Sequence, residues 1–90
     1  MNPELFKGMV FYLEIFSDGN PMDDAFKSKI EGLGGKLSKR INEKVTHLVW
    51  SNGTDKTLAK TFQHENIKIV STLWLEACEH EMTVVEEGKY

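Results

Sequence analysis

The stretch from Ile67 to Cys78 constrains the fold of this chain more than any other. It begins as a short strand rich in β-branched residues and passes directly into Ser71 and Thr72. Either hydroxyl can cap a helix by accepting a hydrogen bond from a free backbone N–H. Small or apolar residues then recur at helical spacing, at Leu73, Trp74, Ala77 and Cys78. This spacing predicts a helix with one apolar face, which must lie on a sheet.

The first half of the chain predicts a central strand followed by a helix. Residues 9–16 are almost continuously apolar or aromatic, as in a strand covered on both faces. Residues 17–21 have the composition of a turn, and Asn20 before Pro21 predicts that a helix begins there. A buried stripe is expected on that helix at Met22, Phe26, Ile30 and Leu33. Gly34, followed by Gly35, suits the left-handed turn that ends it.

The second half predicts alternating strands and helices. Short strands are expected at residues 36–38 and 45–50, and a brief helix at residues 57–64. The strand and helix described first complete the order. Because strands and helices alternate, the fold class is α/β, with parallel strands joined by right-handed crossovers.

Composition limits the class of protein. The 90 residues suffice for one domain, spanning 1–90 with a core from about residue 5 to 88, and 40% of them are apolar. A single cysteine excludes an internal disulfide and a multi-cysteine zinc site. The net charge of −3 argues against general nucleic-acid binding. No apolar run approaches the ~20 residues that span a bilayer, so we expect no membrane association.

The chain resembles the BRCT domain, a module of DNA repair and checkpoint proteins. The resemblance extends over almost the whole sequence and depends on an apolar first strand, a glycine pair after the first helix, a THLV strand and a Trp-x-x-x-Cys helix. The signature residues are Gly34, Gly35, Thr46, His47, Trp74 and Cys78. The resemblance implies a four-stranded parallel sheet of order 2-1-3-4 flanked by three helices.

The resemblance also implies a function. The domain is expected to be a protein–protein interaction module of the DNA-damage response, the cell-cycle checkpoint and chromosome condensation. It would form the N-terminal part of a longer protein found in the nucleus, with the centrosome and cytoplasm as further locations.

BRCT domains that recognise phosphoserine or phosphothreonine peptides hold the phosphate in a shared way. A Ser or Thr at the end of the first strand, the following backbone N–H and a Lys early in the second helix are the donors. These positions correspond here to Ser17, Asp18 and Lys60. All three groups donate to phosphate oxygens. However, the family usually has Gly where Asp18 stands, so the alternative is that Ser17 is a turn residue and Lys60 is solvated.

Two other functions remain open at this stage. Some BRCT domains bind 5′-phosphorylated DNA ends, and Lys36, Lys39 and Arg40 could contact such DNA. The alternative is that this basic run is a solvated strand edge, because it has no aromatic stacking platform. A purely structural or dimerising domain would use an exposed Trp50 or Phe16 as its interface anchor.

Catalytic patterns fail on inspection. The glycine-rich segment 32–38 follows a helix rather than preceding one, and Leu37 stands where a phosphate loop needs Ser or Thr. Neither His64 nor His80 has a second histidine one turn later, so no helical zinc pair exists. Cys78 lacks a cationic partner that would stabilise a thiolate. We therefore expect no enzyme activity, no cofactor and no metal.

Overall fold

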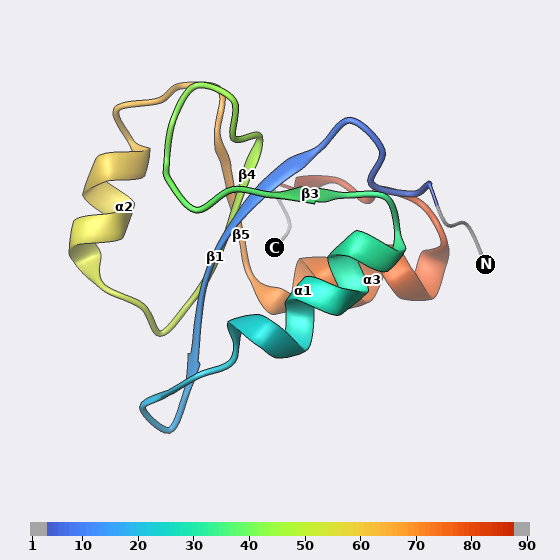
Figure 1. Cartoon of the computed structure of the whole chain (residues 1–90), viewed down its shortest axis with the longest axis horizontal. Coiled ribbons are helices and arrows are strands. Elements are labelled where there is room, and N and C mark those ends of the chain that lie inside the picture. The colour runs from blue at the N-terminus through green and yellow to red at the C-terminus, as the bar shows by residue number, and fades with distance from the viewer. Residues whose placement is uncertain (1–3, 88–90) are drawn as a thin grey trace.

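The computed structural model describes residues 4–87 and shows a parallel sheet with helices on both faces (Figure 1). Helices α1 and α3 lie together on one face, and α2 covers the other. The elements in chain order are β1 (Val10–Ser17), β2 (Asn20–Pro21), α1 (Asp23–Gly32), β3 (Lys36–Leu37), β4 (His47–Ser51), α2 (Asp55–Thr61), β5 (Lys68–Val70) and α3 (Thr72–Glu81).

The sheet confirms the predicted fold class and adds one strand. Strand β1 pairs in parallel with β3 on one side and with β4 on the other, and β4 pairs in parallel with β5. In order of appearance along the chain, these four strands have the predicted order 2-1-3-4. Strand β2 was not predicted, and it pairs antiparallel with the end of β1, so the complete sheet is mixed.

The predicted start of the first helix is wrong, because Asn20 and Pro21 form β2. Asp18 and Gly19 have φ angles of 52° and 79° and connect the two strands as a two-residue hairpin turn. An Asp-Gly pair accommodates two positive φ angles at little cost, and their backbone twist matches that of the paired strands. Helix α1 begins at Asp23, and its N-cap residue Met22 makes no side-chain capping bond.

Two adjacent glycines end α1 for different reasons. Gly34 has a φ of 89°, the left-handed conformation predicted for this position. Gly35 was expected to share this role, but it is required because a side chain at this position would collide with its neighbours. A Cβ atom there would lie 2.6 Å from Cγ2 of Ile30 and 3.0 Å from a ring carbon of Phe11. The close approach of α1 to β1 therefore depends on a missing side chain.

Alternation along β1 divides the interior into two apolar clusters. Phe11, Leu13 and Ile15 face α1 and α3, where they join the larger cluster. Val10 and Tyr12 face the opposite side and pack on a smaller cluster around Leu48. The run of apolar residues in the first strand is explained by this burial on both faces, as predicted.

Trp74 lies at the centre of the larger cluster and is fully buried. Its ring stacks on Phe6 and His47 at centroid distances of 5.7 and 5.0 Å, and its indole N–H donates to the carbonyl of Val85 at 3.1 Å. Ser71, one of the two predicted capping residues, caps α3. However, the predicted apolar face was wrong at Leu73, which is 62% exposed, whereas Leu75 is buried beside Trp74.

Replacing Trp74 with alanine should destabilise the domain by ~3–5 kcal/mol, because it removes a fully buried aromatic ring and leaves a cavity. The matched control is Leu73→Ala on the exposed side of the same helix, which should change stability by less than ~0.5 kcal/mol. Urea unfolding of both variants measures the difference. Equal losses in the two variants would contradict this description of the core.

Candidate functional site

The predicted phosphate-binding residues begin at the carboxyl end of β1. Ser17 is exposed as the last residue of the strand, and Asp18 and Gly19 form the hairpin turn. No hydrogen bond from residues 4–87 engages the Ser17 hydroxyl or the backbone N–H groups of Asp18 and Gly19. The turn therefore presents unpaired donors to solvent.

A shallow hollow of about 350 Å³ lies beside this turn. It is lined by Phe16, Asp18, Gly19, Asn52, Gly53 and Thr54. The Asn52 side chain donates to the carbonyl of Phe16 at 3.3 Å and so ties the loop before α2 to the end of β1. The structure thus brings Asp18 next to the start of α2, but Ser17 and Lys60 do not line this hollow.

Lys60 was expected early in the second helix, but it lies in the last turn of α2. Its side chain is exposed and makes no ion pair within the described part of the chain. With a rise of 1.5 Å per residue, Lys60 lies roughly 9 Å along the axis from the N-cap Thr54. Lys56 lies in the first turn of the same helix.

The start of α2 is already occupied by an acidic side chain that sequence reasoning missed. Glu14, on β1, accepts from the backbone N–H of Thr54 at 3.0 Å and from the Thr57 hydroxyl at 2.8 Å. A carboxylate in this position satisfies free helix N–H groups and favours the helix dipole. A Cβ atom on Gly53 would collide with this carboxylate. The available signal was the single charged residue within the apolar stretch 9–16.

The signature residues Thr46 and His47 form a buried polar connection. His47 is 4% exposed, and its Nδ1 lies 2.8 Å from the Thr46 hydroxyl. Its Nε2 lies 3.0 Å from Glu87, which also lies 3.6 Å from the Lys68 ammonium. Thr46 in turn bonds the backbone of Val10. These contacts hold β4, β5 and the residues after α3 together, which is a structural role.

Burial controls the protonation of His47 and Cys78. Burial lowers the pKa of His47 below its ordinary value of 6.5, although the carboxylate of Glu87 acts in the opposite direction. Burial likewise raises the pKa of the Cys78 thiol, although the N–H of Val85 partly opposes the shift. A buried thiol with a raised pKa is a poor nucleophile, as the sequence predicted.

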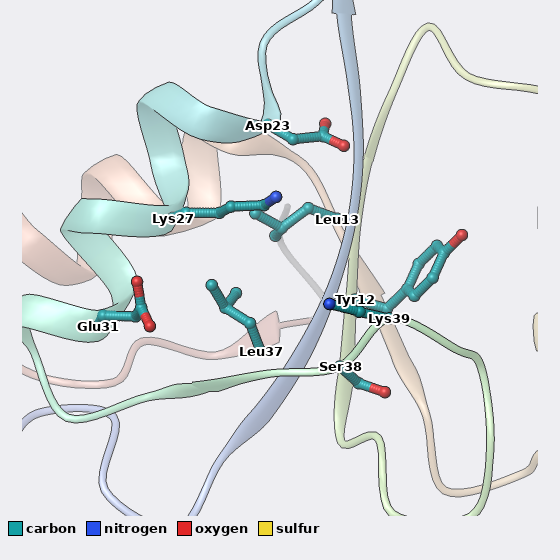
Figure 2. A pocket seen from close by; sticks show the side chains of 8 residues that line it. All are labelled: Tyr12, Leu13, Asp23, Lys27, Glu31, Leu37, Ser38 and Lys39. Atoms are coloured by element: carbon teal, nitrogen blue, oxygen red, sulfur yellow. The ribbon is translucent and has the colours of Figure 1, made fainter.

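A second hollow lies on the other side of β1, between this strand, α1 and β3 (Figure 2). Its volume is about 510 Å³. Lys27 reaches into it from α1, and Lys39 extends toward it from the end of β3. The lining residues are Tyr12, Leu13, Asp23, Lys27, Glu31, Leu37, Ser38 and Lys39.

The side chains suggested for DNA binding and for dimerisation differ in their exposure. Lys36, Lys39 and Arg40 are exposed at and after β3, along one edge of the sheet. Phe16 and Trp50 are half-buried, and the Trp50 indole N–H donates to the carbonyl of Thr54. The most exposed large apolar side chains within residues 4–87 are instead those of Phe62 and Leu73.

Residues 4–87 contain neither a cluster of metal ligands nor a helix that could span a membrane. No group of three or more His, Cys, Asp or Glu side chains in this range is arranged to hold a metal ion. None of the helices in this range has the length and apolar character needed to cross a membrane.

The arrangement of a parallel sheet with α1 and α3 on one face and α2 on the other is that of a BRCT domain, and a family model confirms it. The model for the BRCA1 C Terminus (BRCT) domain matches residues 1–79. The chain therefore belongs to the BRCT family. As a class, BRCT domains are interaction modules rather than enzymes.

Within the family, the chain is similar to microcephalin. It is 29% identical to microcephalin of Homo sapiens over the whole chain, and 31% identical to that of Mus musculus over 93% of the chain. It spans about a tenth of the length of these relatives, 11% and 10% respectively. The sequence had predicted a likeness to the N-terminal BRCT domain of microcephalin from four segments, IFS at 15–17, GKLSK at 35–39, VTH at 45–47 and VSTLW at 70–74.

Solved structures show the same fold. The C-terminal BRCT domain of human XRCC1 has a TM-score of 0.82 at 15% identity, with 100% of this chain and 94% of that chain covered. Rad4 BRCT1,2 in complex with a Crb2 phosphopeptide has a TM-score of 0.70 at 24% identity, with 100% of this chain and 48% of that chain covered. At such identities the likeness establishes the fold alone.

Stability should fall in acid because of His47 and Glu87. The folded state resists protonation of His47, whereas the unfolded chain takes up a proton near pH 6.5, so stability is greatest above this pH and decreases below it. The hydrogen bond from His47 lowers the pKa of Glu87 below 4.5, which adds a further loss at lower pH. Urea unfolding between pH 8 and 5 should show the first decrease.

The variant His47→Gln should flatten this decrease, whereas His80→Gln, at an exposed histidine, should retain it. The same pH dependence in His47→Gln as in the unaltered chain would show that another group is responsible.

Proposed function

We propose that this domain is a non-catalytic interaction module that binds a phosphorylated peptide in the DNA-damage response, the cell-cycle checkpoint and chromosome condensation. Its family membership and its similarity to microcephalin support this assignment. The domain would act in the nucleus and at the centrosome, as the N-terminal part of a longer protein. The phosphopeptide complexes of Rad4, which has the same fold, support the kind of partner.

The observation that carries the phosphate assignment is the hairpin turn after β1. In this turn, neither the Asp18 N–H nor the Ser17 hydroxyl has a hydrogen-bond partner in the described chain. Lys60 would supply the ammonium by extending toward the turn from α2. Together these three groups would donate to a phosphate dianion, whose oxygens are acceptors.

Two carboxylates oppose this binding. Asp18 is part of the turn itself, and Glu14 bonds the first turn of α2. A phosphate would therefore approach a site that already has negative charge. For this reason we expect Asp18→Asn to strengthen binding, since asparagine also tolerates the positive φ and removes the charge.

The test is a titration of the domain with a phosphoserine and phosphothreonine peptide library and its dephosphorylated twin. The phosphorylated peptides should bind more tightly. Lys60→Met should weaken that binding about tenfold, since a charge-assisted hydrogen bond contributes on the order of 1.5 kcal/mol. Lys56→Met, in the first turn of the same helix, is the matched control and should have little effect.

Each alternative outcome has a defined meaning. Equal binding of the two libraries would overturn the phosphate assignment. Weaker phosphopeptide binding by Lys56→Met but not by Lys60→Met would show that the phosphate contacts the first turn of α2, which would contradict the role of Lys60. Retardation of a 5′-phosphorylated duplex, with a salt slope that reflects several phosphate contacts, would favour DNA-end binding instead.

A further inference from the structure

The outer edge of β1 is paired at both ends but not in its middle. At one end, Lys36 and Ser38 donate to the carbonyls of Met9 and Phe11. At the other end, Met22 donates to the carbonyl of Ile15, and the Asp23 carboxylate accepts from the N–H of Ile15 at 2.9 Å. The intervening segment lies between the end of β3 and the start of α1.

Leu13 is the residue at this break. The backbone N–H and C=O groups of successive residues point to opposite edges of a strand. Those of Val10 point toward β4, where the Val10 carbonyl accepts from the N–H of Thr46. The backbone groups of Phe11, Leu13 and Ile15 therefore point to the outer edge. No hydrogen bond from residues 4–87 reaches the N–H or the carbonyl of Leu13 on this side. A backbone N–H and carbonyl left unpaired at a sheet edge can form hydrogen bonds with a strand of another chain.

The 510 Å³ hollow described above opens onto this break and gives it room for a ligand. Figure 2 shows Lys27 extending from α1 toward Leu13, with Lys39 approaching from the side of β3. Asp23 and Glu31 also line the hollow, and Lys27 lies 3.3 Å from Asp24 on the same helix. One carboxylate oxygen of Asp23 is already used by the N–H of Ile15. Glu31 lies beside α1, at the end of the hollow away from Lys39.

We propose that this break is a second peptide-binding site, in which the backbone of Leu13 pairs with one residue of an extended, acidic peptide segment. In an antiparallel pair, a single residue exchanges both hydrogen bonds with the residue opposite, so one peptide residue fills the break. Its side chain lies on the same face as that of Leu13, toward Lys27. A carboxylate there also gains from the ammonium of Lys39. The proposal does not depend on phosphate binding near Ser17, because it uses the middle of β1, whereas Ser17 lies at the carboxyl end of the strand.

Amide hydrogen exchange tests the break in the 90-residue chain alone. The Leu13 amide should exchange faster than those of Val10 and Ile15, which donate to Thr46 and Asp23. Equal protection at Leu13 would mean that the break is closed within the chain, which overturns the proposal.

A blocked tripeptide, acetyl-Val-Glu-Val-amide, is the ligand probe, and its Gln counterpart is the neutral control. In a titration followed by ¹⁵N chemical shifts, the Glu peptide should shift the Leu13 amide most and slow its exchange. Lys39→Gln should weaken binding about two- to fivefold, as expected for a partly exposed ion pair. Lys44→Gln, at an exposed lysine outside the hollow, should not.

Three outcomes would contradict the proposal. Equal binding of the Gln peptide would remove the requirement for an acidic side chain. Equal shifts with sodium acetate at matched ionic strength would indicate anion attraction without backbone pairing. The largest shifts at Asp18 and Gly19 would place the peptide at the phosphate site instead. Loss of binding to phosphopeptides with Lys60→Met tests that other site and leaves this proposal unaffected.

Discussion

The packing of the Trp74 ring is the interaction on which the rest of the structure depends. The ring is fully buried between Phe6, from the segment before β1, and His47, from β4. Its N–H bonds the carbonyl of Val85, in the segment after α3. One side chain on α3 thus connects segments from the beginning, middle and end of the described chain. Apolar burial provides most of this stabilisation, and the hydrogen bond satisfies the one polar atom of the ring.

With this core in place, β1 has two functional surfaces of different character. At its carboxyl end, the Asp18–Gly19 turn exposes backbone donors, but Asp18 and Glu14 add negative charge. Along its outer edge, the backbone of Leu13 has no hydrogen-bond partner within residues 4–87, and Lys27 and Lys39 line the hollow beside it. Backbone donors beside two carboxylates and an unpaired strand edge beside two lysines favour different ligands. Both surfaces exist because β2 and β3 pair with only short parts of the same strand.

Several features of the fold were predictable because each depends on local chemistry. The Ser71 cap, the left-handed Gly34 and the double-sided burial of residues 9–16 follow from capping, backbone conformation and periodicity. The hairpin was predictable too, since Asp-Gly is a strong signal, but Asn20 before Pro21 also fits a helix start. Leu73 and Leu75 were misassigned because short amphipathic helices leave the edges of the buried face ambiguous.

By itself, the sequence determined the fold class and the residues at the centre of the core, and its resemblance to the BRCT family implied the order of the parallel strands. Periodicity and turn residues act over a few positions, which is why they can be read directly from the chain. Tertiary structure decided which groups meet across the fold, such as Glu14 with the start of α2 and His47 with Glu87. It also decided that the backbone groups of Leu13 have no hydrogen-bond partner within residues 4–87. These contacts join residues far apart in sequence, so their distances depend on how the whole sheet pairs and packs.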